Sequence, residues 1–110
     1  MELLDRSEAE TYATWFRALS DPTRVQILEL LAREDRPLSV GEIVAAVGLA
    51  QSTVSQHLKI LAGVRFLLVE PDGNARMYRV NERCLSRFPS AADVVMGRPA
   101  PDAGDACPEV

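Results

Sequence analysis

Apolar and polar positions separate most clearly over residues 48–62 of this 110-residue chain. Val54, Leu58 and Leu61 stand at i, i+4 and i+7, so they share one stripe of a predicted helix. The opposite face carries amide, hydroxyl and ammonium groups, from Gln51, Ser52, Ser55, Gln56 and Lys59. Such groups hydrogen-bond base edges and phosphates in a DNA major groove. A polar surface helix without a ligand is the alternative.

A shorter helix is predicted directly before this one. Ser39 and Glu42 have the spacing of a capping box, so a helix should begin at Val40 and run to Val47. Gly48 can adopt the left-handed conformation that ends a helix. A helix, a glycine-containing turn and a second helix with a polar face form a helix-turn-helix, and the second helix is the one expected to read DNA.

The N-terminal part of the chain predicts a helix over residues 8–19, capped by Ser7 with Glu10. Its aromatic and aliphatic residues fall on one face, namely Tyr12, Trp15, Phe16 and Leu19. Such a stripe is typical of a protein core, and it is also typical of a subunit interface, where aromatic residues are enriched. Both roles remain open for this helix.

A second helix is expected to follow at once, with Asp21 as its N-cap and Pro22 at its first position. It should run to about Arg33, and its wide apolar arc makes it the central buried helix. Arg24 lies in the first turn, where a positive charge opposes the helix dipole. We therefore expect Arg24 to serve a specific partner, an acidic neighbour by default and a DNA phosphate as the alternative.

After the predicted reading helix the pattern becomes extended. Residues 64–70 and 76–80 are rich in strand-forming side chains, and residues 71–74 between them are rich in turn formers. This β-hairpin would be a wing, and Arg76 and Arg79 would bring positive charge to the phosphate backbone or minor groove. Solvated charges that protect a sheet edge are the alternative.

The C-terminal part predicts a helix from Glu82 that breaks at Pro89 and resumes over residues 90–96. We expect one domain over residues 1–97, followed by a disordered acidic tail over 98–110. The predicted fold class is mainly α with a two-stranded β-wing, a winged helix-turn-helix.

Composition is that of an ordinary globular protein, with 47% hydrophobic and 25% charged residues. The net charge of −4 opposes DNA binding, yet residues 36–79 hold five basic side chains against three acidic ones. No segment predicts a membrane span or a signal peptide, so we expect a cytoplasmic protein. With one histidine and no paired acids in a plausible cleft, the sequence does not predict an enzyme.

Three motifs together resemble the ArsR/SmtB family of bacterial winged-helix repressors. They are ALSDPTRVQILELL at 18–31, STVSQHLKIL at 52–61 and the hairpin end Tyr78-Arg79-Val80, within a match over about residues 7–96. The resemblance implies repression of an adjacent operon by a homodimer that binds double-stranded operator DNA, one reading helix per subunit. By position it implies DNA contacts from Gln51, Ser52, Thr53, Ser55, Gln56, His57, Lys59, Arg76 and Arg79. His57 could instead be a hydrogen-bonded structural residue.

The resemblance also implies that the first and last helices form the dimer interface. The residues of these helices that we expect there are Tyr12, Trp15, Phe16, Leu85, Val94 and Val95. A winged-helix module that binds another protein rather than DNA is a second reading of the same fold, and it would not need a polar reading face.

Members of this family often sense metals or metalloids, and this sequence departs from several of their patterns. It has no thiol in the helix before the reading helix, and its one histidine lies within the reading helix. A lone histidine is not a metal site. The remaining soft ligands are Cys84 and Cys107, which could bind a thiophilic ion such as As(III) or Hg(II). A disulfide switch through the same pair and inert thiols are the alternatives.

Overall fold

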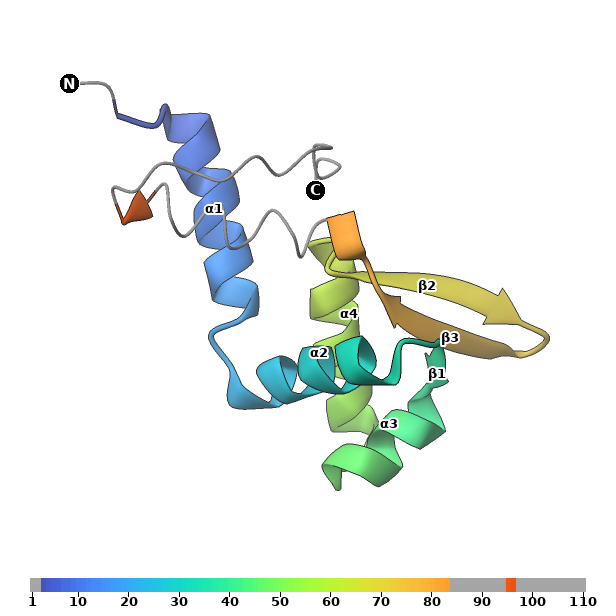
Figure 1. Cartoon of the computed structure of the whole chain (residues 1–110). Coiled ribbons are helices and arrows are strands. Elements are labelled where there is room, and N and C mark those ends of the chain that lie inside the picture. The colour runs from blue at the N-terminus through green and yellow to red at the C-terminus, as the bar shows by residue number, and fades with distance from the viewer. Residues whose placement is uncertain (1–2, 84–94, 97–110) are drawn as a thin grey trace.

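The computed structural model of the chain describes residues 3–83 and 95–96. Its elements are, in chain order, α1 (Arg6–Ala18), α2 (Pro22–Glu34), β1 (Leu38–Ser39), α3 (Val40–Val47), α4 (Gln51–Gly63), β2 (Leu67–Asp72) and β3 (Ala75–Val80). The helices form the body, and the β2–β3 hairpin projects from it as a wing (Figure 1). This is the predicted winged helix-turn-helix. The predicted tail at 98–110 and most of the last helix lie outside the described residues.

The sheet is antiparallel and has the strand order β1-β3-β2. β1 is a two-residue strand that the sequence pattern did not predict, and it pairs Leu38 with Tyr78 of β3. The hairpin is tighter than expected, because Asp72 pairs with Ala75 and leaves a two-residue turn. Gly73 supplies the positive φ of 63° in that turn. Pro71 stays within β2, which is an edge strand and tolerates the missing N–H.

Local capping signals explain where the central helices begin and end. The Asp21 side chain accepts hydrogen bonds from the first turn of α2, and Ser39 and Glu42 form the predicted capping box of α3. Gly48 ends α3 with a φ of 76°. These three predictions are confirmed, and they fix the relative positions of α2, α3 and α4 along the chain.

The predicted start of α1 is wrong by two residues. Asp5 and Glu8 form its capping box, with the Glu8 N–H donating to Asp5 over 2.8 Å, whereas this role was predicted for Ser7 and Glu10. Both pairs have the same spacing, so the pattern alone could not separate them. The earlier cap adds two residues to the helix.

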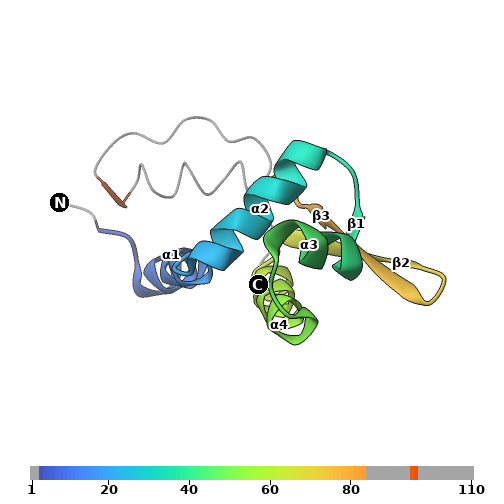
Figure 2. The same cartoon turned by 90° about the horizontal axis from the view of Figure 1, so that it is seen from below.

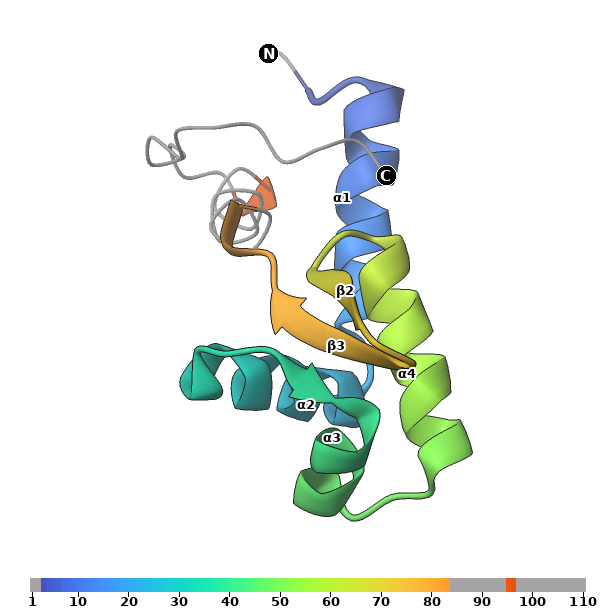
Figure 3. The ribbon, with the colours of Figure 1, turned by 90° about the vertical axis from the view of Figure 1, so that its right-hand side faces the viewer.

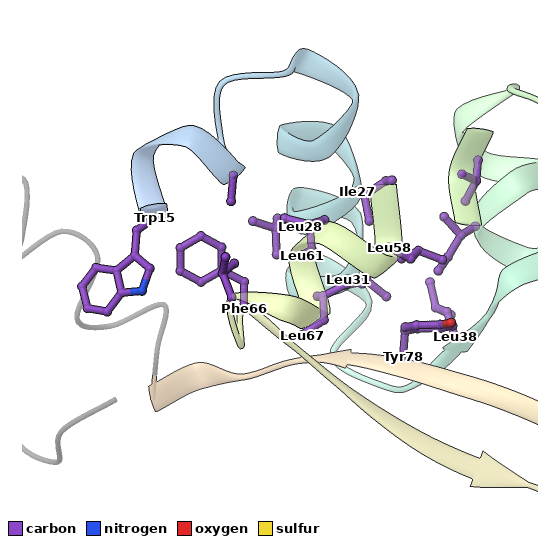
Figure 4. Close-up of a cluster of buried hydrophobic side chains, with 14 residues drawn as sticks. Trp15, Ile27, Leu28, Leu31, Leu38, Leu58, Leu61, Phe66, Leu67 and Tyr78 are labelled. Carbon is purple, nitrogen blue, oxygen red and sulfur yellow. The ribbon is translucent and has the colours of Figure 1, made fainter. Parts of the chain in front are cut away.

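One hydrophobic core joins all of the elements (Figure 4). Ile27, Leu58 and Phe66 are fully buried near its centre. Trp15 lies at one end beside Phe66, and Leu38 and Tyr78 lie at the other end (Figure 4). α1 contributes Trp15 and Ala18 from its C-terminal half, so the core anchors that half.

Seen from below, α1 and the wing lie at opposite ends of the molecule, with α3 and α4 between them (Figure 2). The base of the wing is held to the body by Asn81, directly after β3. Its backbone N–H donates to the Phe66 carbonyl over 2.9 Å. Its side-chain amide donates to the Arg65 carbonyl, also over 2.9 Å. Over residues 3–83 and 95–96, no helix is both long enough and apolar enough to span a membrane.

Candidate nucleic-acid interface

Helix α4 lies along the edge of the body, opposite α2 and α3 (Figure 3). Val54, Leu58 and Leu61 are each 0% exposed, so the predicted apolar stripe holds the helix against the core. The polar residues of the outer face are exposed to solvent, namely Gln51, Ser52, Thr53, Ser55, Gln56 and Lys59. The helix therefore presents amide, hydroxyl and ammonium groups outward on a rigid support.

The N-terminal end of α4 has no side-chain cap. Ala50 is the N-cap residue, it makes no side-chain hydrogen bond, and the first turn contains no acidic residue. The backbone N–H groups of this turn are thus left without intrahelical partners, at the positive end of the helix dipole. That arrangement suits a phosphate. The signal in the sequence is Ala50 at the N-cap position, which was not among the predicted features.

A groove of about 730 Å³ runs between α4, the start of α3 and the wing. From α4 it is lined by Gln51, Ser55 and Lys59. The wing contributes Arg76 and Asn74 among other residues. The reading helix and the wing, which were predicted as separate features, therefore share one surface.

The positive charges of this surface differ in how they are paired. Lys59 and Arg76 are exposed and have no ion-pair partner within the described part of the chain. Arg79 is instead bound by the Glu70 carboxylate on the neighbouring strand, and both side chains are about half exposed. The two predicted wing arginines thus have different environments, and Arg76 is the one that is available to a ligand.

The start of α3, which borders the groove, is held by charge as well as by its cap. Arg36 donates to Glu42 over 3.0 Å and also lies 3.6 Å from Glu34. Hydrogen bonds from the backbone N–H of Ser39 and from the Arg36 side chain lower the pKa of Glu42. Glu42 is therefore anionic at neutral pH, and its negative charge is paired with Arg36 at the edge of the groove.

His57, which the sequence predicted as a DNA contact or a hydrogen-bonded structural residue, is partly buried and has a hydrogen-bond partner within the protein. Its side chain is only 16% exposed, and its Nδ1 lies 3.1 Å from Nη1 of Arg24. Nε2 lies 4.0 Å from the Asp21 carboxylate. Of the two roles left open by the sequence, the structure shows the hydrogen-bonded structural one.

The salt bridge expected between Arg24 and an acidic side chain is not formed among the described residues. Nε of Arg24 donates to the Ala18 carbonyl over 2.6 Å, and Nη2 of Arg24 donates to the Arg17 carbonyl over 3.4 Å. These are carbonyls at the C-terminal end of α1, where a cation is favourable. Arg24 therefore caps one helix while it sits in the first turn of the next.

Asp21 completes this group of side chains. Partial burial raises the pKa of Asp21, but hydrogen bonds from the backbone N–H groups of Thr23 and Arg24 outweigh it. The charge of Arg24, and that of His57 when its ring is protonated, acts in the same direction as these bonds, so the pKa of Asp21 lies below its ordinary value. The carboxylate is thus stabilised in its charged form at the corner between α1 and α2.

The residues predicted for the dimer interface divide into three sets. Tyr12, Phe16 and Val95 line an apolar hollow of about 530 Å³ along α1. Trp15 is 4% exposed and belongs to the core of the protomer, so its placement at the interface is corrected. Its indole N–H has no hydrogen-bond partner among the described residues. Leu85 and Val94 lie outside the described residues.

The candidate metal ligands Cys84 and Cys107 also lie outside the described residues. Within residues 3–83 and 95–96, no three histidine, cysteine or carboxylate side chains cluster closely enough to hold a metal ion. His57 accordingly has no ligand partners in this part of the chain beyond the single carboxylate of Asp21.

Comparison with known proteins gives concordant matches. Residues 21–67 match the family described as bacterial regulatory protein, arsR family. The HTH-type transcriptional regulator Rv0081 of Mycobacterium tuberculosis is 37% identical over 87 residues, which are 78% of this chain and 75% of that protein. The probable mercury resistance operon repressor of Streptomyces lividans is 36% identical over 87 residues, 79% of this chain and 63% of that protein.

A solved structure gives the same result for the fold. The homodimeric winged helix-turn-helix DNA-binding domain Mb0332 from Mycobacterium bovis, a possible ArsR-family transcriptional regulator, superposes with a TM-score of 0.67. Its sequence identity is 28%, and the match covers 86% of this chain and 87% of that one. The similarity therefore extends well beyond the helix-turn-helix itself.

Proposed function

This chain belongs to the ArsR family of bacterial regulatory proteins, and from that premise we propose that it represses transcription as a homodimer bound to its operator. Family membership makes it a transcriptional regulator and not an enzyme. Its place of action would be the cytoplasm, where bacterial DNA lies. The observation that supports the proposal most strongly is the exposed polar face of α4. It lies beside the uncapped N-terminal end of the same helix and lines a groove together with the wing.

The proposed base contacts come from the outer face of α4. Gln51, Gln56 and Lys59 are long enough to reach base edges from a helix in the major groove, and Gln can bond adenine with both ends of its amide. Ser52, Thr53 and Ser55 are shorter and would bond the nearer bases or phosphates. His57 is no longer among the proposed contacts, because Arg24 holds it.

From the wing, Arg76 is proposed to bind a backbone phosphate. Its charge is unpaired among the described residues, and it lines the same groove as Lys59. Arg79 would join it only after leaving Glu70. The wing thus adds affinity that does not depend on base sequence and that weakens with salt.

Dimer formation is proposed to use the apolar hollow along α1. Tyr12 and Phe16 lie in this hollow with Val95, and the last helix would add Leu85 and Val94. An exposed apolar hollow on a chain of 110 residues is costly to leave in water. The homodimeric state of the M. bovis domain supports this arrangement.

For the inducer, we propose a thiophilic ion such as As(III) or Hg(II), bound through Cys84 and Cys107 within or between subunits. Thiolates are the ligands that soft ions prefer, and a relative is named as a probable mercury resistance operon repressor. Release from the operator would need a coupling of about 1 to 3 kcal/mol between ion binding and DNA binding. A disulfide between the same cysteines is the alternative inducing event.

The experiment is a gel-shift titration with DNA from upstream of the protein's own coding region. A sequence-specific complex is expected, and adding arsenite or mercuric chloride should release it. The double variant Cys84→Ser/Cys107→Ser should bind equally well and stay bound. Peroxide in place of the ions separates the redox alternative from ion binding. Release of the double variant by every agent would rule out both thiol mechanisms.

A winged-helix module that binds protein is the rival function. If this rival were correct, the wild-type chain would give no sequence-specific gel shift with DNA. Replacing Ser52 or Lys59 would also leave its affinity for the partner protein unchanged. The exposed amide and hydroxyl groups of α4 argue against it, because a protein-binding surface is typically apolar at its centre.

A further inference from the structure

The corner between α1 and α2 joins α1 to the part of the protein that carries the reading helix. Only the C-terminal half of α1 enters the core, through Trp15 and Ala18, and the helix then runs away from the wing (Figures 1 and 2). Residues 19–21 connect it to α2. If α1 forms the dimer interface, as proposed above, this corner is the joint between the interface and the DNA-reading part of each subunit.

The Arg24 side chain makes three contacts at this joint, two with α1 and one with α4. It donates to the Ala18 carbonyl over 2.6 Å and to the Arg17 carbonyl over 3.4 Å, so it holds the end of α1. Its Nη1 lies 3.1 Å from His57 Nδ1 on α4. One side chain of α2 thus contacts both the last turn of α1 and the reading helix α4, which are far apart in sequence.

The Arg24–His57 contact depends on the protonation state of the imidazole. A guanidinium group can only donate hydrogen bonds and keeps its charge, so Nδ1 of His57 must be the acceptor and must carry no proton. The charged groups that face the ring within the described chain are Arg24 of α2 and Asp21 at the corner. Protonation would remove the acceptor and place two positive groups in contact, with Asp21 left to attract the imidazolium.

We propose that Arg24 and His57 form a bracket that sets the angle between α1 and α4, and thereby the spacing of the two reading helices in the dimer. Both are positioning residues that do not touch DNA. The proposal rests on the proposed function, since it needs a dimer joined through α1 and an operator with two half-sites.

The size of the effect follows from the geometry of DNA. Half-sites one helical turn apart place each reading helix about 17 Å from the dimer axis, half of the roughly 34 Å repeat. A change in the angle between α1 and α4 would move the two reading helices away from this separation, and base pairs are only roughly 3.4 Å apart along the DNA axis. A loosened bracket would therefore weaken binding to two half-sites at a fixed spacing while each single half-site is still read.

The bracket also predicts a pH dependence with a definite sign. Protonation of Nδ1 would remove the acceptor for Arg24, so acidification that protonates His57 should open the bracket and weaken binding to the two-site operator. A glutamine at position 57 offers Arg24 an amide oxygen that does not titrate. It should therefore preserve binding and abolish the pH dependence.

The test compares two duplexes, the footprinted operator with both half-sites and a duplex with one half-site. His57→Leu removes the acceptor and is expected to lower affinity for the two-site duplex about tenfold or more, through lost bivalency, while single-site affinity stays within about twofold. His57→Gln is the matched control and should bind as wild type does at pH 8. Circular dichroism checks that both variants are folded.

The pH profile of the wild type needs no destabilising substitution and serves as the second measurement. Affinity for the two-site duplex should fall on acidification in the wild type and stay level in His57→Gln. Equal two-site affinities of wild type and folded His57→Leu, or parallel pH profiles of wild type and His57→Gln, would overturn the bracket. A wild type that binds neither duplex would instead refute the proposed function, and the inference with it.

Discussion

Arg79 on β3 is bound to Glu70 on β2, across the two strands of the wing. Arg76, three residues earlier on β3, has no such partner among the described residues. In the wing, the charge of Arg79 is therefore paired with Glu70, and the charge of Arg76 is exposed and unpaired among the described residues. Because the pair is about half exposed, solvent weakens it, and a phosphate can compete with Glu70 for Arg79.

Glu70→Gln should strengthen DNA binding. The substitution frees the Arg79 guanidinium for a phosphate and removes a negative charge from the wing, so affinity should rise for all sequences. The plot of log affinity against log salt should steepen by about one unit, as expected for one further phosphate contact. Arg76→Ala is the opposite control and should flatten the same plot by about one unit. Unchanged affinity of Glu70→Gln would show that Arg79 does not reach DNA.

Gln56→Ala should reduce specificity rather than general affinity. The side chain lies on the exposed face of α4, and losing its amide contacts should cost about 1 to 3 kcal/mol at one base position. The measurement is a competition assay with operators that are mutated one base pair at a time. Ser7→Ala, in the exposed first turns of α1, is the control and should bind as wild type does.

Leu58→Ala should destabilise the protein by about 2 to 5 kcal/mol, because the side chain is fully buried beneath the reading helix. Ile60→Ala removes an apolar side chain from the same helix at a position that is 44% exposed, and it should cost much less. Urea denaturation at one fixed protein concentration compares the two variants, since a dimer's stability depends on concentration. Similar losses in both would contradict the observed burial of α4.

Asp21→Asn tests the lowered pKa of Asp21 through stability against pH. A carboxyl whose pKa is lower in the folded than in the unfolded protein stabilises the fold above the unfolded pKa, and this contribution is lost as pH falls through the folded pKa. Asparagine still caps the helix, so the variant removes mainly the charge. Its urea midpoint should lie below that of the wild type at neutral pH, and the two should converge below about pH 3.8. A constant difference would contradict the assignment.

Phe16→Glu should dissociate the dimer by placing a charge in the apolar hollow that Phe16 shares with Val95. In sedimentation experiments the wild type should have twice the chain mass of 12.1 kDa, and the variant should have that mass itself. Arg6→Ala, at an exposed ion pair of the same helix, is the control and should remain dimeric. A monomeric wild type at micromolar concentration would refute dimerisation.

Much of the fold followed from the sequence, because its signals are local. The caps at Asp21, Ser39 and Gly48 involve hydrogen bonds across two to four residues, and each was predicted correctly. The buried stripe of α4 and the hairpin were predicted from periodicity for the same reason. The start of α1 failed because two capping boxes of equal spacing overlap, at Asp5 and at Ser7.

Where a feature depends on packing, the sequence could not specify it. β1 is a strand only because Leu38 pairs with Tyr78 of β3, and a pattern of two residues is too short to predict a strand. Polar residues of α4 could be assigned to the outer face, yet the inward turn of His57 depends on Arg24, which lies 33 residues earlier.

With the exception of β1, the sequence by itself thus determined which segments are helix or strand and which face of each helix is apolar, since these follow from hydrogen bonds and side chains a few residues apart. The tertiary structure decided which polar groups are free and which are held, as for Arg76 against Arg79 and for Gln56 against His57. Pairing of charges is set by how distant segments pack, and that packing is a property of the whole chain.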